Sequence, residues 1–315
     1  MSRRVLVTGA SGFLGARVEA LANSELGVSG ESWDWIFTDR FPRQESEARS
    51  SVGHFEACDL GDLTQVERLI SANFPDSVVH LAGALGGDGS AEAREALFRS
   101  NLMSTCNILE ALRRAGAGPG QCPQFVLAST GLIYGDQSVP FDEAMECRPP
   151  NDYSLTKMLA ESAVQAYARQ GIVRACLLRP AVLYGPGQGG SMFIPALISS
   201  LRREQRFPMT AGAQRRDFVY VDDAAAAVHL VVETGSEGIF NIGAGRGISI
   251  REVGEVIAAM LGRPELLGVG DIPYRQREVW DYVLDSTRIR SAGWSPKTEI
   301  LEGLLNTIRH GSDAK

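Results

Sequence analysis

The chain has 315 residues, of which 44% are hydrophobic and 22% charged, the composition of an ordinary globular protein with one large domain or two closely joined ones. A net charge of −7 without a long Lys/Arg run excludes a basic face for nucleic acid, and the absence of an apolar stretch of about 18 residues excludes a membrane span. The five cysteines form no Cys-x-x-Cys pair and no signal peptide precedes the first strand pattern, so we expect free thiols and a cytoplasmic protein.

Short β-rich runs alternate with longer helical patterns in the first half of the chain, which is typical of a parallel α/β sheet. We expect strands over residues 3–8, 33–38, 53–57, 77–81, 124–129 and 173–179. Helices are expected to begin at Phe13 and to cover residues 91–115 and 153–170. The stretch 24–32 is a longer loop than the turn needs, and 83–89 is a glycine-rich loop. The pattern predicts a Rossmann-type, doubly wound α/β fold.

The pattern of expected helices and strands changes after Pro180. A glycine-rich loop at 185–190 is followed by expected helices at 193–203, 222–232, 250–261 and 300–309 and by expected strands at 217–221 and 239–242. We interpret residues 1–180 as the Rossmann domain and residues 181–315 as a smaller mixed α/β lobe, with parts of 215–250 returning to the first domain.

Three glycines stand between the first strand and the first helix. Gly9 permits a tight turn, Gly12 lets the backbone approach a pyrophosphate, and Gly15 lets the helix pack closely on the strand. The N–H groups and positive dipole end of that helix then face an anion. The pattern predicts a bound dinucleotide, against the alternative of a glycine turn without a ligand.

A carboxylate follows the second strand, at Asp39. At this place it would accept hydrogen bonds from the ribose hydroxyls of NAD and repel the 2′-phosphate of NADP. Arg40 and Arg43 favour NADP instead, because a guanidinium could bind that 2′-phosphate. We expect NAD, with NADP as the weaker alternative.

Tyr153 and Lys157 are four residues apart on an expected helix, so their side chains share one face. An ammonium beside a phenol lowers the pKa of the tyrosine, which can then exchange a proton with a substrate hydroxyl. A surface pair is the plain alternative. Ser129 and Thr130 favour the catalytic interpretation, because hydroxyls at the carboxyl end of a parallel strand lie in the ligand crevice.

In its motifs the chain resembles the extended short-chain dehydrogenase/reductase family, in its nucleotide-sugar epimerase/dehydratase branch. The resemblance covers nearly the whole chain. Its motifs, in order, are Thr8-Gly9-x-x-Gly12-Phe13-Leu14-Gly15, Cys58-Asp59-Leu60, His80-Leu81-Ala82-Gly83, Asn101, Ser129-Thr130-x-x-Ile133-Tyr134-Gly135, Tyr153-x-x-x-Lys157, Leu178-Arg179-Pro180, Arg216-Asp217-Phe218-Val219-Tyr220-Val221-Asp222-Asp223, Phe240-Asn241-Ile242-Gly243 and Gly293-Trp294.

The resemblance implies roles for the matching positions. Thr130 would hydrogen-bond the reacting sugar oxygen, Tyr153 would be the base, and Lys157 would orient the nicotinamide ribose. Asp59 and Leu60 would form the adenine pocket, and Asn101 would support the site. The other residues expected to bind the cofactor are Gly9, Gly12, Phe13, Leu14, Gly15, Asp39, Arg40, Leu81, Ala82, Gly83 and Pro180.

Substrate contacts are implied as well. Ser129 and Thr130 would face the sugar, while Arg216 and Arg275, or Arg277 in place of the latter, would bind the diphosphate of a nucleotide sugar through their guanidinium forks. The resemblance also implies a homodimer formed through the helices 91–115 and 153–170.

The sequence departs from these relatives at two places. The 4,6-dehydratases carry an Asp-Glu pair after the catalytic threonine, where this chain has Gly131 and Leu132, which cannot transfer protons. Val182 replaces an asparagine that contacts the sugar diphosphate in many relatives. We therefore expect an epimerase that passes through a 4-keto sugar. The alternatives are an NAD(P)H-dependent 4-ketoreductase, a dehydrogenase of a small sugar acid, and a non-catalytic dinucleotide sensor.

Several polar residues have plainer interpretations. His80 is expected to be a structural residue at a strand end, and the histidines show no metal-ligand spacing. Arg216 with Asp217 could be a surface ion pair. The acidic residues Asp142, Glu143 and Glu146 are expected in a solvated loop.

Overall fold

The computed structural model describes residues 2–24, 33–42, 53–86, 89–276 and 278–310. Most of the expected loop 24–32 lies outside the described residues, as do Arg43 and Arg277. The described chain forms two compact units. The first comprises Met1–Ile133, Pro149–Arg179 and Ala225–Phe240, and the second comprises Tyr134–Arg148, Pro180–Ala224 and Asn241–Lys315.

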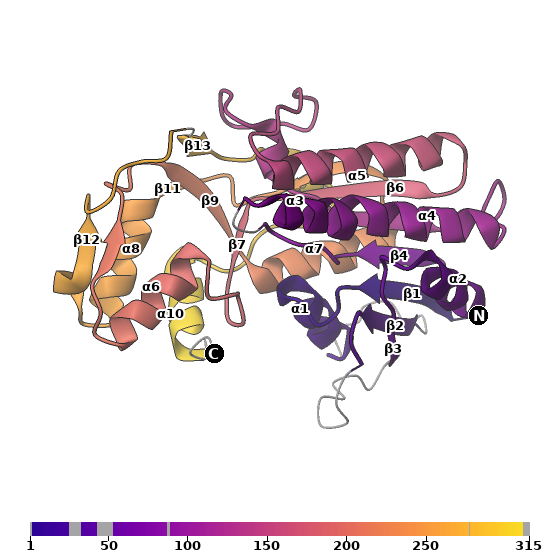
Figure 1. Cartoon of the computed structure of the whole chain (residues 1–315), viewed down its shortest axis with the longest axis horizontal. Coiled ribbons are helices and arrows are strands. Elements are labelled where there is room, and N and C mark those ends of the chain that lie inside the picture. The colour runs from indigo at the N-terminus through magenta and orange to yellow at the C-terminus, as the bar shows by residue number, and fades with distance from the viewer. Residues whose placement is uncertain (1, 25–32, 43–52, 87–88, 277, 311–315) are drawn as a thin grey trace. The chain divides into compact units, whose positions relative to one another are not determined.

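A seven-stranded sheet in the order β10-β6-β5-β4-β1-β2-β3 forms the centre of the Rossmann fold (Figure 1). The pairs from β6 across to β3 are all parallel. The strand order reverses between β1 and β4, which is where open α/β sheets bind ligands. The strands are β1 (Arg3–Thr8), β2 (Trp33–Asp39), β3 (Gly53–Ala57), β4 (Ser77–His80), β5 (Gln124–Ala128), β6 (Arg174–Pro180) and β10 (Gly238–Ile242).

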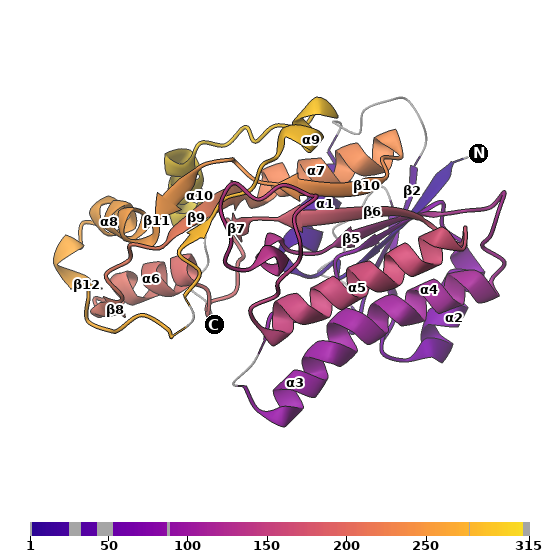
Figure 2. The ribbon, with the colours of Figure 1, turned by 90° about the horizontal axis from the view of Figure 1, so that it is seen from above.

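Helices cover both faces of this sheet, and the strands inside the edge strand β3 are accordingly mostly apolar on both faces. Helices α2 (Leu63–Asn73), α4 (Ser104–Arg114) and α5 (Asp152–Arg169) pack on one face, and α1 (Phe13–Ala22) packs on the other (Figure 2). Val5, Leu6 and Val7 of β1 are fully buried. Burial of each such side chain contributes about 1.5–3 kcal/mol, so the central strand is fixed by its own sequence.

The expected single helix over 91–115 is wrong in detail. The chain forms α3 (Ala91–Phe98), a π-helical segment η2 (Arg99–Met103) and then α4. A π-helical turn inserts one residue into the hydrogen-bond ladder, and such insertions often occur at functional sites. The apolar repeat continues on both sides of η2, so the pattern did not reveal the insertion.

The start of α5 is set by a capping box. The Asn151 side chain accepts a hydrogen bond from the Ser154 N–H at 2.9 Å, and the Ser154 hydroxyl oxygen accepts one from the Asn151 N–H at 3.3 Å. These bonds satisfy N–H groups that a helix terminus otherwise leaves without partners. The cap places Tyr153 in the first turn of the helix and Lys157 one turn later.

The second unit holds smaller sheets and the C-terminal helices (Figure 1). Its core includes Tyr184, Leu197, Phe218, Ile257 and Leu304. One four-stranded sheet contains β7 (Val182–Tyr184), β9 (Arg215–Tyr220), β11 (Gly247–Ser249) and β13 (Asp281–Tyr282), and β8 (Phe207–Met209) pairs with β12 (Leu267–Val269). The helices are α6 (Phe193–Arg202), α7 (Val221–Thr234, which continues into the first unit), α8 (Ile250–Met260), α9 (Thr287–Ser291) and α10 (Ile300–His310), with short 3₁₀ turns η3 (Gly131–Tyr134) and η4 (Pro264–Leu266).

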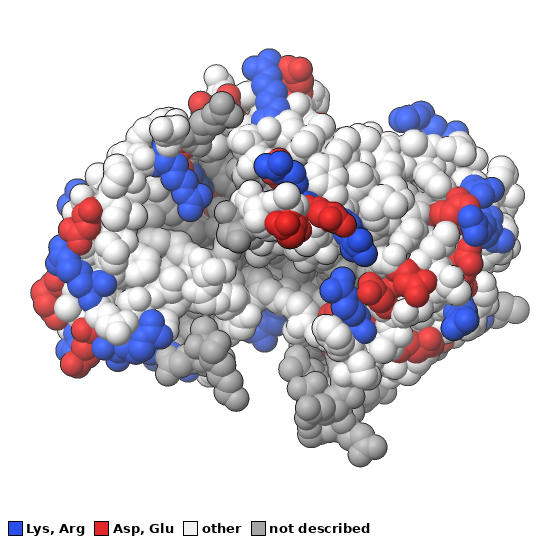
Figure 3. Space-filling model, viewed as in Figure 1, with Lys and Arg blue, Asp and Glu red and all other residues white. Residues whose placement is uncertain are grey.

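Charged side chains of both signs are intermixed over the face of the molecule shown in Figure 3. None of the helices in the described ranges is both long and apolar enough to cross a membrane. Within the same ranges, His, Cys, Asp and Glu side chains form no group of three that could hold a metal ion.

Candidate active site

The glycine turn after β1 is built as tightly as its spacing predicts. Gly9 has φ +69°, and a Cβ on it would lie 2.6 Å from the Ala82 nitrogen. The Gly12 N–H donates to the Gly9 carbonyl at 3.0 Å, and a Cβ on Gly15 would lie only 2.1 Å from that same oxygen. Gly12 begins α1 without a side-chain cap. The first N–H groups of α1 therefore have the arrangement that binds a pyrophosphate.

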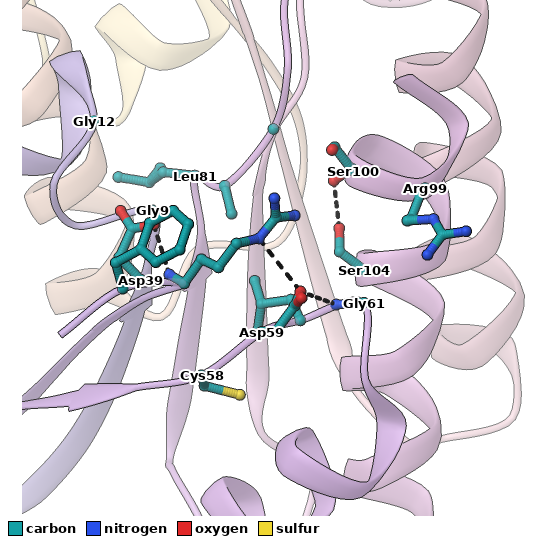
Figure 4. Close-up of a pocket in the computed structure, with 15 residues that line it drawn as sticks. Gly9, Gly12, Asp39, Cys58, Asp59, Gly61, Leu81, Arg99, Ser100 and Ser104 are labelled. Carbon is teal, nitrogen blue, oxygen red and sulfur yellow. Dashed lines mark hydrogen bonds and ion pairs between the residues drawn. The ribbon is translucent and has the colours of Figure 1, made fainter. Parts of the chain in front are cut away.

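A cavity of about 310 Å³ opens beside this turn, entirely within the first unit (Figure 4). Figure 4 shows Asp39 and Leu81 on one side of it and Ser100 and Ser104 on the other. Nine of the residues expected to bind the cofactor line the cavity, namely Gly9, Gly12, Asp39, Arg40, Asp59, Leu60, Leu81, Ala82 and Gly83.

Six further residues line the cavity and were missed by the sequence analysis: Phe41, Cys58, Gly61, Arg99, Ser100 and Ser104. Arg99 and Ser100 belong to η2, whose extra residue sets which side chains face the cavity. Phe41 is 73% exposed. It directly follows Asp39 and Arg40, which were expected to bind the cofactor, and this neighbourhood is the only feature of the sequence that could have indicated it. The expected cofactor residues outside the cavity lining are Phe13, Leu14, Gly15, Asn101, Tyr153, Lys157 and Pro180.

Two carboxylates, of Asp39 and Asp59, and two guanidinium groups, of Arg40 and Arg99, set the charge at this cavity. The Asp39 side chain accepts hydrogen bonds from the N–H groups of Ser11 at 3.1 Å and Arg40 at 2.8 Å. The Arg40 Nε lies 3.5 Å from Asp59 Oδ1, which also accepts the Gly61 N–H at 2.9 Å. Arg40 is about half exposed, so this ion pair contributes little free energy. It does place the Arg40 charge beside Asp59 and leaves the carboxylate of Asp39 on the cavity.

Asp39→Ala is expected to weaken NAD binding by about tenfold or more and to reduce discrimination against NADP, because a charged hydrogen-bond acceptor is lost. Calorimetric titration with both dinucleotides measures the two affinities. Asp34→Ala, a change of the same charge at the other end of β2, is the matched control. Equal NAD affinities for Asp39→Ala and wild type would contradict the assignment.

The structure brings Thr130, Tyr153 and Lys157 together within the first unit. Thr130 follows β5, and its hydroxyl hydrogen-bonds the Tyr153 phenol. The Lys157 ammonium donates to the carbonyl oxygen of Ala128, the last residue of β5, at 2.7 Å. Ser129 is buried, and its hydroxyl makes no hydrogen bond within the described part of the chain. A buried hydroxyl in this state can serve a bound ligand.

Burial is the largest influence on the pKa values of Tyr153 and Lys157. Removal from water raises the pKa of Tyr153 to about 12, with the hydrogen bond from Thr130 acting the other way. Removal from water lowers the pKa of Lys157 to about 8, opposed by the attraction of Glu161. The expected lowering of the Tyr153 pKa is therefore wrong, because desolvation of the phenolate outweighs the other influences.

His80 is fully buried at the end of β4. Its Nδ1 lies 2.7 Å from the Thr8 hydroxyl and its Nε2 3.0 Å from the Thr105 hydroxyl. Burial, aided by the charge of Lys157, lowers the pKa of His80 to about 3, so the ring is neutral. The Thr105 hydroxyl donates to the Asn101 carbonyl at 2.8 Å and so accepts from Nε2. These contacts agree with the structural role expected of His80.

Asn101, within η2, links the loop after β4 to α5 through hydrogen bonds. Its Oδ1 accepts the Ala84 N–H at 2.7 Å. Its Nδ2 donates to the Ala84 carbonyl at 3.0 Å and to the Thr156 hydroxyl at 2.9 Å. Thr156 in turn donates to the Tyr153 carbonyl at 2.8 Å. Asn101 thus supports α5 at the turn that carries Tyr153.

His80→Ala is expected to lower the free energy of unfolding by about 2–4 kcal/mol, because it leaves a cavity and removes the partner of two buried hydroxyls. Urea denaturation measures the loss. His54→Ala is the control, since His54 is about half exposed and pairs with Glu56 at the surface. Similar stabilities for the two variants would exclude this role for His80.

The second unit holds the two arginines expected to bind a diphosphate. Arg216 is 16% exposed, and its guanidinium donates to Glu278 and to the Val279 carbonyl. Arg275 is exposed. The alternative of a surface pair between Arg216 and Asp217 is wrong. Asp217 is fully buried and accepts the N–H groups of Ala244 and Gly245 at 2.8 and 3.1 Å. Burial raises its pKa to about 6.

The acidic stretch at 142–146 is only partly the solvated loop that was expected. Asp142 caps the Ala144 N–H at 2.7 Å, and Glu146 pairs with Arg148 at the surface. Glu143 instead accepts the backbone N–H of Asn241 at 2.9 Å. That contact spans 98 positions in the chain, so local sequence could not predict it.

Pro180, expected near the cofactor, accepts a hydrogen bond from the Tyr282 hydroxyl at 3.0 Å.

The glycine turn, the cavity with its carboxylates and the Thr-Tyr-Lys group define a dinucleotide-dependent enzyme of the Rossmann class. The model of the NAD dependent epimerase/dehydratase family matches residues 5–243, and the chain belongs to this family. It is therefore an NAD-dependent enzyme of the extended short-chain dehydrogenase/reductase type.

Relatives of known name match over nearly the full chain. The chain is 29% identical to a putative UDP-glucose 4-epimerase of Methanocaldococcus jannaschii, covering 96% of this chain and 97% of the relative. It is 30% identical to a dTDP-glucose 4,6-dehydratase of Mycolicibacterium smegmatis, covering 97% and 92%. Among solved structures, a UDP-glucose 4-epimerase of Thermus thermophilus in complex with NAD is similar with a TM-score of 0.83, 29% identity and 98% of both chains covered.

Proposed function

We propose that this protein is an NAD-dependent nucleotide-sugar epimerase that acts through a transient 4-keto sugar. One observation carries the proposal. Thr130, Tyr153 and Lys157 meet at the end of β5, while the two positions after Thr130 are Gly131 and Leu132. Alcohol–ketone interconversion needs one proton carrier, which Tyr153 supplies. Elimination of water would need further acids and bases, and these two side chains have none.

The residues of the cavity would hold the cofactor. The glycine turn suits its pyrophosphate, Asp39 its adenine ribose, and the walls around Asp59 and Leu81 its adenine end. Oxidised NAD held there would supply a hydride acceptor and donor for the sugar carbon, and its positive charge would favour the Tyr153 phenolate. Tyr153 takes the proton of the sugar hydroxyl and later gives it back. Thr130 holds that hydroxyl, and Lys157 stabilises the phenolate.

We also propose that the substrate carries a diphosphate that Arg216 and Arg275 bind. Glu278 and the Val279 carbonyl hold the Arg216 fork in one orientation, which supports bidentate contact with phosphate oxygens. An incoming diphosphate competes with Glu278 for this guanidinium. The named relatives act on UDP- and dTDP-linked sugars, which is consistent with such a substrate.

A dimer through α4 and α5 is a further part of the proposal. Met103 is 49% exposed where η2 leads into α4. Leu155, Met158 and Leu159 of α5 are only half-buried in the single chain. Exposed apolar side chains on neighbouring helices suit a four-helix contact between two copies. Sedimentation equilibrium is expected to give twice the mass of a single chain. A mass equal to that of a single chain would show that the dimer proposal is wrong.

A panel of UDP- and dTDP-linked sugars tests the activity. The expected result is interconversion of two epimers without net change in NADH absorbance, and release of NAD when the purified protein is denatured. Consumption of NADPH on a 4-keto sugar by protein lacking bound cofactor would instead identify a ketoreductase. Loss of water from the sugar would identify a dehydratase. Tight NAD binding without turnover on any sugar would identify a dinucleotide sensor.

A further inference from the structure

A buried ion pair joins α5, at a position four residues after Lys157, to β6. Glu161 of α5 and Arg179 of β6 are each only 4% exposed. The Arg179 Nε donates to Glu161 Oε1 at 3.0 Å, and its Nη2 donates to Oε2 at 2.7 Å. This is a bidentate pair in which one guanidinium fork occupies both carboxylate oxygens. A buried pair of this kind is weak support for stability, because desolvation of the charges offsets most of their attraction.

The pair is linked to Lys157 by helix geometry. Tyr153, Lys157 and Glu161 follow one another at intervals of four residues, so they lie along one face of α5. A carboxylate at this spacing can form an ion pair with the lysine before it. In the structure the carboxylate oxygens of Glu161 bind Arg179, and the Lys157 ammonium donates to the Ala128 carbonyl.

The Lys157 ammonium also lies close to the cofactor cavity. A Cβ on Gly83, which lines that cavity, would lie 3.2 Å from Nζ. The ammonium thus occupies the space between the end of β5 and the loop after β4. If Glu161 captured the ammonium, the nitrogen would move along α5, away from both. The orientation of the Glu161 carboxylate therefore affects the position of the Lys157 ammonium.

We propose that Glu161 and Arg179 are positioning residues for Lys157: Arg179 holds the Glu161 carboxylate so that its charge keeps the lysine protonated without drawing the ammonium away from Ala128 and Gly83. The charged and titratable groups around Lys157 are Glu161 and Tyr153 on α5, His80 on β4, and Arg179 on β6 through Glu161. Of these, Glu161 carries the negative charge that opposes the effect of burial on the lysine. The catalytic role of Lys157 itself rests on the proposed function.

The composition of the chain makes a direct test possible. The sequence has only three lysines, Lys157, Lys297 and Lys315, so NMR of protein with carbon-13 labelled lysine gives three side-chain signals to follow with pH. Lys297 is exposed and serves as an internal reference. Lys157 is expected to titrate near its pKa of about 8.

Glu161→Gln is expected to lower the titration midpoint of Lys157, because the opposing negative charge is gone. Glu161→Asp is expected to restore the midpoint toward wild type, since the charge returns. Asp152→Asn removes an equal charge from the same helix, at a residue whose ion pair with Arg94 is exposed, and is expected to leave the midpoint unchanged. An unchanged midpoint in Glu161→Gln, or equal shifts in Glu161→Gln and Asp152→Asn, would overturn the proposal.

Arg179→Lys provides the second variant, in case Glu161→Gln does not fold. A lysine holds the carboxylate less firmly than the guanidinium fork, so Glu161 turns toward Lys157 and raises its midpoint. The change also adds one lysine signal, which comparison with wild type identifies. Opposite shifts in the Glu161 and Arg179 variants support the proposal, and a lowered or unmoved midpoint in Arg179→Lys contradicts it.

Turnover supplies an independent readout. If the proposed reaction is correct, Glu161→Gln moves the alkaline limb of the kcat profile to lower pH. We compare kcat at one fixed pH below the Lys157 pKa with kcat at one fixed pH above it. The ratio of the first to the second is expected to rise about tenfold for each unit by which the Lys157 pKa is lowered. If no nucleotide sugar is turned over, the proposed function fails, whereas the lysine titration still decides the role of Glu161 and Arg179.

Discussion

Tyr153→Phe is expected to lower kcat by about 10²–10⁴-fold while the affinity for NAD stays near that of wild type. Thr130 interacts with the Tyr153 phenol, and phenylalanine keeps the ring but cannot take or give a proton. The ring itself is half-buried, so the helix and the neighbouring cavity keep their packing. Steady-state kinetics on the sugar that is turned over, with NAD binding measured separately, gives both quantities.

Tyr167→Phe is the matched control for this experiment. Tyr167 lies on the same helix α5 and is also half-buried, but its hydroxyl contacts Glu110 at 3.3 Å rather than the site. Its replacement is expected to leave kcat within about twofold of wild type, because a partly exposed hydrogen bond contributes little. A Tyr153→Phe enzyme that keeps a tenth or more of wild-type kcat would show that another group carries the proton.

Local sequence predicted most of the Rossmann sheet, because its central strands are buried on both faces. The run Val5-Leu6-Val7 and the pair Val78-Val79 contain apolar, mostly β-branched side chains without polar interruption, and each is fully buried. The boundaries of β1 to β6 accordingly agree with expectation to within one or two residues. The strands β7, β8, β11, β12 and β13 were missed, because two or three residues are too few to show an alternation.

The candidate site was predictable where function depends on backbone or on helical spacing. Gly9 and Gly15 are dictated by close approach of the backbone, and Tyr153 with Lys157 by one helical turn. Contacts between distant segments were not predictable. Arg216 pairs with Glu278, 62 positions away, and Glu161 with Arg179 across α5 and β6. The sign of the Tyr153 pKa shift was missed for the same reason, because burial is a property of the folded chain.

Gly15→Ala is expected to lower the free energy of unfolding by about 3 kcal/mol or more and to weaken NAD binding at least about tenfold. The added Cβ would lie 2.1 Å from the Gly9 carbonyl oxygen and 2.8 Å from the Ala10 Cα. These are backbone atoms of the glycine turn itself, so α1 must move away from β1 or the turn must open. Either movement displaces the N–H groups that face the pyrophosphate.

The expected sign is opposite to that of helix propensity, which favours alanine over glycine by about 1 kcal/mol. Gly254→Ala makes the same change inside α8, where the nearest atoms to a new Cβ are the Met209 sulfur at 3.4 Å and the Leu267 Cδ1 at 3.5 Å. That variant is expected to gain about 0.5–1 kcal/mol and to bind NAD as wild type does. Chemical denaturation and calorimetric titration of both variants measure the contrast. If Gly15→Ala also gains stability and still binds NAD, the close packing of α1 on the glycine turn does not constrain this protein.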